Sequence, residues 1–400
     1  MLGRRKKRNK LPGRLLVVAV LVICLVVICV RYSNMKKEKE LAVTTAINSA
    51  NELSQGYFYE EALQVLADSG YEAEEKILAV QQEIETQQAT LTEYDGEFYH
   101  VFFHSLVVYP ELAFDGDYKA EGYDMWMTTV SEFQAMLPQL YERDFILYPM
   151  NLIQKDQPVM LPAGKKPLII SIDDVNYYDY MEGDGFAERL VVDENGEIVC
   201  EVVTPEGKAE LSYNGDVMPI LDQFVKEHPD FSFRGAKGVV AVTGYEGAFG
   251  YNFIKAEGEE KQKLMDEATK VATALKNTGW LIACHSYTHN DYFKDGTVSN
   301  ENLHYDTNRF KERIYEVVLQ PDIYISPFGY HLHEGDERLM YLKNMGYDYF
   351  CPVSTAMRTL YTKEGVVISE RFNLDRYNMR NQKKFINETF FDVDSVYYKN

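Results

Sequence analysis

Short apolar strands alternate with helices from Phe98 onward, and no other feature of the sequence constrains the fold as strongly. The expected strands are 99–108, 166–172, 238–242, 280–284, 323–326, 349–353 and 365–368. Between or beside them, helical spacing predicts helices at 129–141, 217–227, 261–277, 308–318 and 337–345. Such alternation indicates α/β architecture with parallel strands. About seven core strands favour an irregular (β/α)7-type barrel.

A stretch within this region, 188–213, has a different texture. Three β-rich pieces are separated there by the turn sequences DENG at 193–196 and PEG at 205–207. This pattern predicts a β-meander inserted at about 186–214, outside the barrel wall.

Polar clusters directly follow three of the expected strands. The sequence LIISI is followed by Asp173 and Asp174, WLIAC by HSYTH at 285–289, and IYI by SPFG at 326–329. Because the carboxyl ends of strands in barrels and open α/β sheets form the ligand-binding face, these clusters should meet there.

The residue types in these clusters suit a metal centre. His285 and His289 have i,i+4 spacing, which on a helical turn would let both imidazoles share one cation, although paired histidines with ordinary hydrogen bonds have the same spacing. A carboxylate would complete a site for Zn²⁺, or for Co²⁺, Ni²⁺ or Fe²⁺. Consecutive residues at a strand end point apart, so one of Asp173 and Asp174 could bind metal while the other faces water. An Asp pair in a turn or at a helix N-cap is the alternative.

Together these motifs resemble those of the polysaccharide deacetylase family, also called the NodB-homology family or carbohydrate esterase family 4. SIDD at 171–174 is similar to the family's TFDD motif, and HSYTH at 285–289 matches H[ST]xxH. SPFGY at 326–330 resembles the end of RxPYG, and FFHSLV at 102–107 resembles the start of the domain. The resemblance spans roughly residues 98–370.

The resemblance implies a role for each matched residue. It makes Asp173 the general base, and Asp174, His285 and His289 the ligands of a divalent metal, most often Zn²⁺. The backbone N–H of Phe328 would help to hold the oxyanion. The implied reaction is metal-dependent deacetylation of N-acetylated cell-surface polysaccharide, such as peptidoglycan or a chitin-like glycan.

The sequence departs from the family pattern in its later motifs. Ile325 stands where the family has the arginine that orients the base, and the acidic fourth motif and the histidine of the fifth are missing. His331 and His104 are candidates for the missing general acid, and Arg371 ends the last expected strand. A catalytically impaired glycan-binding scaffold, or an O-acetyl esterase, is therefore the alternative to an N-deacetylase.

The N-terminus predicts a membrane association. The apolar run 15–30 follows seven basic residues, which favours a cytoplasmic tail (1–13), a single-pass signal anchor (14–32) and an extracellular remainder. A cleaved signal peptide is the alternative. Residues 33–95 have helical spacing and predict a helical stalk that leads to a deacetylase-like domain at 96–400.

The charge distribution disfavours nucleic acid as a partner. Eight basic residues and no acidic residue lie in 1–31, so residues 32–400 carry 33 basic against 62 acidic side chains. Phosphate backbones would be repelled by this excess, and no basic stripe offsets it. The sequence does not indicate an oligomeric state.

Overall fold

The computed structural model describes residues 13–398, which divide after Ala89 into two compact units. The boundary lies near the predicted start of the deacetylase-like domain at residue 96. The predicted basic tail lies outside the described residues except for Gly13.

The first unit is built on one long helix, α1 (Gly13–Gln55). It carries the apolar run and continues without a break into the predicted stalk. The apolar side chains of the run are exposed to solvent. By length and composition, α1 could cross a membrane, and a signal sequence would have the same properties.

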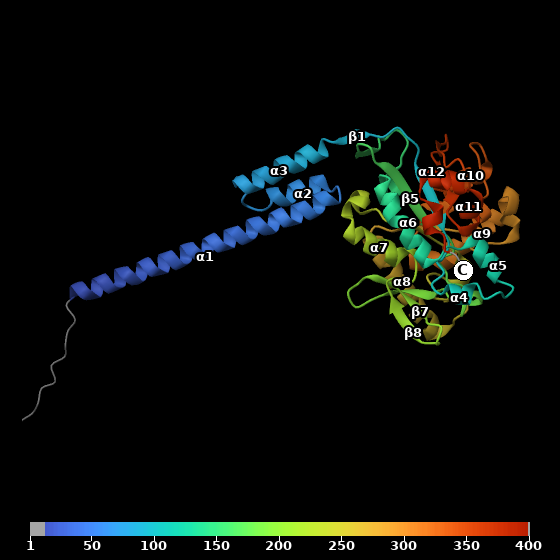
Figure 1. Cartoon of the computed structure of the whole chain (residues 1–400), viewed down its shortest axis with the longest axis horizontal. Helices are drawn as coiled ribbons and strands as arrows, with labels where there is room; N and C mark the ends of the chain where they lie inside the picture. The colour runs from blue at the N-terminus through green and yellow to red at the C-terminus, as the bar shows by residue number, and fades with distance from the viewer. Residues whose placement is uncertain (1–12, 399–400) are drawn as a thin grey trace, which may run out of the picture. The chain divides into compact units, whose positions relative to one another are not determined.

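Two shorter helices, α2 (Tyr59–Ala67) and α3 (Glu75–Gln88), pack against α1 in this unit (Figure 1). The three helices bury a small shared core of Ala50, Ala62, Leu66, Ile77 and Ile84. A helix pair alone could not bury its apolar face. Here α1 supplies the third surface.

The second unit contains a curled sheet of mostly parallel strands, which confirms the predicted fold class. Six neighbouring parallel strands form its main path: β2 (Tyr99–Phe103), β5 (Lys166–Ile172), β9 (Val239–Val242), β10 (Leu281–Cys284), β11 (Ile323–Ile325) and β12 (Tyr349–Cys351). The next strand, β14 (Val367–Ser369), pairs with β12, and β15 (Phe372–Asn373) pairs with β2. Because only two residues separate β14 from β15, this last segment joins the two sides of the curled sheet.

Apart from the meander described below, four short strands lie outside this path. β3 (Phe145–Leu147) pairs in parallel with β5, and β13 (Thr359–Tyr361) pairs antiparallel with β14. A separate two-stranded sheet consists of β1 (Leu91–Glu93) and β4 (Met160–Pro162). These additions make the barrel irregular.

Most helices of the second unit contribute buried residues to the same hydrophobic core as the strands, whereas Ala113 of α4 and Tyr123 of α5 belong to a separate small cluster. The longer helices are α6 (Val130–Glu142), α7 (Val217–Glu227), α8 (Gly258–Asn277), α9 (Asn300–Val318) and α10 (Glu337–Asn344). The shorter helices are α4 (Pro110–Ala113), α5 (Ala120–Trp126), α11 (Arg376–Asn381), α12 (Lys383–Thr389) and α13 (Val393–Val396). The starts of α6 and α9 are fixed locally, since Thr129 forms a capping box with Glu132 and Ser299 caps α9.

The predicted meander is present as a separate antiparallel sheet. It consists of β6 (Ala187–Val192), β7 (Ile198–Val203) and β8 (Ala209–Ser212), and none of these strands pairs with the barrel. Tyr251, which follows β9 in the chain, donates its hydroxyl to the Leu190 carbonyl and ties this insertion to the barrel.

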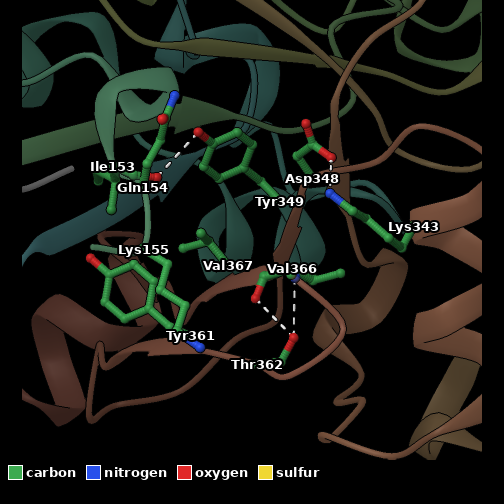
Figure 2. A pocket seen from close by; sticks show the side chains of 11 residues that line it. Ile153, Gln154, Lys155, Lys343, Asp348, Tyr349, Tyr361, Thr362, Val366 and Val367 are labelled. Carbon is green, nitrogen blue, oxygen red and sulfur yellow. Dashed lines mark hydrogen bonds and ion pairs between the residues drawn. The ribbon is translucent and has the colours of Figure 1, made fainter. Parts of the chain in front are cut away.

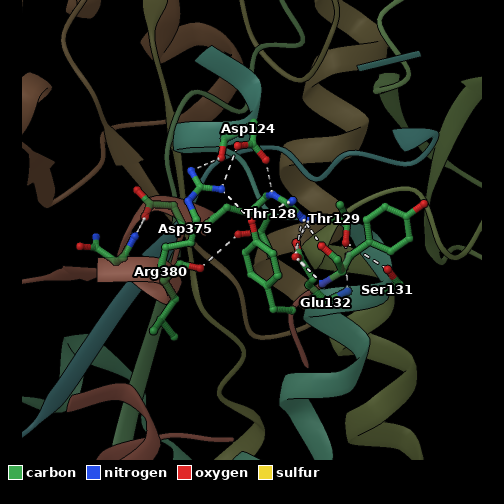
Figure 3. Close-up of polar contacts among 12 residues, drawn as sticks. Asp124, Thr128, Thr129, Ser131, Glu132, Asp375 and Arg380 are labelled. Atoms are coloured by element: carbon green, nitrogen blue, oxygen red, sulfur yellow. Dashed lines mark hydrogen bonds and ion pairs between the residues drawn. The ribbon is translucent and has the colours of Figure 1, made fainter. Parts of the chain in front are cut away.

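A partly buried charge network holds the C-terminal segment. The Arg376 guanidinium bonds Glu132 at 2.6 Å and Asp124 at 2.8 Å, and Arg380 also bonds Asp124. Figure 3 shows the polar contacts around Asp124, Glu132 and Arg380. The chain after the last barrel strand is thereby tied to α5 and α6.

Candidate metal centre

The three predicted polar clusters lie at the same edge of the barrel. Asp173–Asp174 follow β5, His285 follows β10 and Phe328 follows β11. Strands β5, β9, β10 and β11 are consecutive parallel neighbours, so their carboxyl ends are adjacent.

Asp174, His285 and His289 come together as one group. Each offers a ligand atom, and the three atoms lie within 4.8 Å of one another. The His285 and His289 rings have centroids 5.0 Å apart. His285 is buried, whereas Asp174 and His289 are partly exposed, so solvent reaches the group. Two imidazoles and a carboxylate suit Zn²⁺ and its transition-metal neighbours.

Asp174 is held by two hydroxyl groups on one oxygen. Tyr178 and Thr243 donate to its Oδ1 at 2.5 and 2.7 Å, which leaves Oδ2 for a ligand. Burial alone would raise the pKa of this carboxyl, but the His289 and His285 rings and the Tyr178 hydroxyl hold it below its usual value. Asp174 is therefore an anion in position to bind a cation.

His285 is oriented by the barrel wall. Its Nδ1–H donates to the Ile325 carbonyl at 2.9 Å, so the unprotonated Nε2 faces the site. Burial lowers the pKa of His285 despite the opposing effect of Asp173 and Asp174, which favours the neutral, metal-binding form. The Ile325 backbone therefore orients a candidate metal ligand, although the Ile325 side chain stands where the polysaccharide deacetylase motif has an arginine.

The prediction that His285 and His289 share a helical turn is wrong. The segment is an irregular loop with φ of 66° at Ser286 and 43° at His289. Asp306 of α9 accepts the backbone N–H groups of Tyr287 and Thr288 at 2.7 and 2.8 Å. These hydrogen bonds compete with helical ones, so the loop and not a helix brings the rings together.

Asp173 has a different partner from Asp174. The Arg371 guanidinium donates to its Oδ1 at 2.6 Å, and the two side chains are 0% and 4% exposed. Burial would raise the pKa of Asp173, but Arg371 and then His285 hold it below its usual value. Arg371 also stacks on the Phe102 ring at 4.3 Å. Ile325 cannot supply a guanidinium group, yet Asp173 has a buried guanidinium partner in Arg371, which lies between β14 and β15.

The two candidate acids are placed differently. The His104 ring is close enough to lower the pKa values of Asp173 and Asp174, and its buried Nδ1 has no hydrogen-bond partner among residues 13–398. The Nε2–H of His331 instead donates to the Val353 carbonyl at 2.8 Å. The arrangement favours His104 over His331.

Phe328 borders the same group. Its ring centroid lies 4.4 Å from that of His289, and its backbone has a φ of 56°. The side chain is 45% exposed, which puts this loop at the open side of the site.

Sequence reasoning missed Thr243, Tyr178 and Asp306 as supporting residues. Thr243 directly follows strand β9, so the rule that found the other clusters could have found it. Asp306 lies inside a helix and gives no local signal. Its role depends on how α9 packs against the loop.

A separate hollow lies at the opposite edge of the barrel, where β12 and β14 begin (Figure 2). Its polar groups bond mainly to one another: Lys343 with Asp348, Thr362 with Val366, and Tyr349 with the Ile153 carbonyl. These groups are therefore not free to converge on a ligand.

No family model and no curated protein matches the sequence. The solved structures that are similar to part of the chain include the following two. The Streptococcus pyogenes deacetylase PplD in complex with acetate has a TM-score of 0.40 and 12% identity, over 72% of this chain and 98% of that chain. IcaB from Ammonifex degensii has a TM-score of 0.40 and 11% identity, over 74% of this chain and 99% of that chain. At this sequence identity and TM-score the two structures carry no argument about function, so a functional proposal must rest on the residues of the site.

Proposed function

We propose that the chain is a metal-dependent deacetylase that hydrolyses the acetamide groups of an N-acetylated cell-surface polysaccharide, such as peptidoglycan or a chitin-like glycan. One observation carries the proposal: Asp174, His285 and His289 offer ligand atoms within 4.8 Å of one another, next to Asp173 in its buried pair with Arg371. One carboxylate would bind metal, and its neighbour would remain free to accept a proton.

The donor set fits a divalent cation, with Asp174, His285 and His289 as the residues that would hold it. A bound Zn²⁺, Co²⁺, Ni²⁺ or Fe²⁺ would polarise a carbonyl oxygen and lower the pKa of water. The hydroxyl groups of Tyr178 and Thr243 on Asp174 and the Ile325 carbonyl on His285 would fix two of the ligands.

The other residues would handle protons and charge. Asp173 takes a proton from the attacking water, while Arg371 fixes the carboxylate and keeps it ionised. The Phe328 backbone N–H donates to the developing oxyanion. His104 donates a proton to the leaving nitrogen as the carbon–nitrogen bond breaks, which yields acetate and a free amine. His331 is the second choice for that step.

We further propose that α1 anchors the protein in the cell membrane, with a cytoplasmic N-terminus and an extracellular catalytic domain. The apolar composition of α1 and the basic residues that precede it support this topology. The substrate would then be a glycan outside the membrane.

Acetate release tests the proposal. Protein loaded with zinc should release acetate from N-acetylated oligosaccharides, and Asp173→Asn and His285→Ala should each lower the rate at least 100-fold. His304→Ala is the matched control, because His304 is exposed and stacks on Tyr341 of α10. Release from O-acetyl esters alone would identify an esterase. Activity that survives both substitutions would refute the proposed chemistry.

A further inference from the structure

Three tyrosine rings form a parallel stack beside the candidate metal centre. The Tyr178 ring stacks on Tyr180 with a centroid distance of 5.4 Å, and on Tyr245 with a distance of 5.2 Å, at interplanar angles of 15° and 10°. Tyr178 and Tyr180 lie in the loop after β5, and Tyr245 lies after β9. The stack is therefore built from the two loops that also position Asp174 and Thr243.

The stack joins the centre directly through Tyr178, whose hydroxyl donates to Asp174 Oδ1 at 2.5 Å. Tyr178 is 6% exposed and packs in a small apolar cluster with Met181 and Phe186. Tyr180, one ring further out, is 54% exposed.

The backbone that carries Tyr180 is fixed from two sides. Lys119, which directly precedes α5, donates to the Tyr180 carbonyl at 2.8 Å and pairs with Asp184. On the other side, Lys255 bridges Asp179 and Glu246 at 2.7 and 3.0 Å. A single exposed aromatic ring is ordinary on a protein surface. Tyr180 differs because its ring is backed by a stack and its loop is pinned, which gives a preformed flat surface.

Such a surface suits one class of ligand. The apolar face of a sugar ring can lie against an aromatic face, while its hydroxyl groups reach polar atoms at the edge. Asp179, next to Tyr180 in the chain, has a side chain that is 59% exposed despite its ion pair with Lys255, so its carboxylate can accept hydrogen bonds from such hydroxyl groups. A small acetylated molecule bound at the metal centre would not need Tyr180. A glycan chain would extend beyond the centre and cover the ring.

We propose that Tyr180, backed by Tyr178 and Tyr245, is a binding subsite for a sugar residue next to the one that is deacetylated, so that the substrate is a glycan chain and not a single acetylated sugar. This inference rests on the proposed function, because it takes the centre at Asp174 as the point of attack. The exposed face of Tyr180 supplies the contact, and the two inner rings keep it in place.

Binding to N-acetylglucosamine oligomers tests this subsite. The full-length chain in detergent would carry Asp173→Asn to prevent turnover, and calorimetry would measure affinity for oligomers of one to six sugars. Affinity should rise with chain length. Tyr180→Ala should weaken binding of the longer oligomers about tenfold and leave the single sugar unchanged. Tyr180→Phe should bind like the parent because it keeps the ring.

Tyr305→Ala is the matched control, since Tyr305 on α9 is 55% exposed. Three results would overturn the subsite: no oligomer binding, equal binding by Tyr180→Ala, or an equal loss with Tyr305→Ala. Acetate release by the chain without Asp173→Asn separates the two proposals. Oligomer binding that depends on Tyr180, without acetate release, would refute deacetylation and leave the subsite standing. If the chain releases acetate from long oligomers and Tyr180→Ala does not slow this release, the subsite is refuted and deacetylation stands.

Discussion

The pair between Arg371 and Asp173 makes a prediction about stability that does not depend on any activity. Replacement of Arg371 by methionine keeps much of the side-chain volume and removes the charge. Asp173 would then be a buried carboxylate without its guanidinium partner. The expected loss is about 3–5 kcal/mol in the free energy of unfolding, the usual cost of breaking a buried ion pair.

The magnitude follows from burial. The side chains are 0% and 4% exposed, and the Nη1–Oδ1 distance is 2.6 Å, so water cannot replace the lost partner. A solvent-exposed pair would contribute only about 0–1 kcal/mol. Arg189→Met provides that comparison, because the Arg189–Glu201 pair has side chains 38% and 30% exposed.

A double-mutant cycle with Asp173→Asn isolates the interaction. Each single substitution leaves one buried charge unpaired, whereas Arg371→Met combined with Asp173→Asn removes both charges. The double variant should therefore lose about 2–3 kcal/mol less than the sum of the two single losses. Urea unfolding followed by tryptophan fluorescence measures this, since Trp280 is buried in the barrel unit. Additive losses, or an Arg371→Met loss no larger than that of Arg189→Met, would refute the buried pair.

Three further predictions concern the loop, the C-terminal segment and the metal. Asp306→Asn should weaken zinc binding about 10–100-fold in chelator competition, because Asp306 fixes the loop that carries His289; unchanged affinity would contradict that role. Burial raises the pKa of Asp375 to about 7, well above the usual value of about 3.9, so the folded state binds an extra proton between those values. The stabilisation that protonated Asp375 contributes is complete below about pH 4 and is lost as the pH rises through 7, although Arg380 opposes the pKa shift. In urea unfolding, the free energy of unfolding should therefore fall between pH 5 and pH 8, and this fall should be smaller in Asp375→Asn. An equal fall in Asp375→Asn would exclude Asp375 as its origin. Chelation should lower the unfolding temperature, and zinc should restore it in the parent but not in His285→Ala.

The barrel could be predicted from the sequence because its strands are short apolar runs with clear ends. The expected segments 166–172 and 217–227 coincide with β5 and α7. The start of α9 was placed too late, at 308 instead of Asn300, because the first turns are mostly polar. Their helical form depends on the Ser299 cap and on packing of Leu303.

The site was predictable where chemistry follows a strand and not where it depends on packing. Strand ends identified Asp174 and His285, which the fold brings together with His289. The loop conformation of 285–289 could not be predicted, because it depends on hydrogen bonds to Asp306 on another element. Arg371 was visible at the end of the last strand. Its pairing with Asp173 could not be predicted, because the two residues meet only in the closed barrel.

The central claim is that one cation is shared by Asp174, His285 and His289. Anomalous diffraction at the zinc edge, from crystals of zinc-loaded protein, tests it most directly. The account predicts one strong peak about 2.0–2.2 Å from a ligand atom of each of the three residues. A peak bound elsewhere, or none at this site in zinc-saturated crystals, would contradict it.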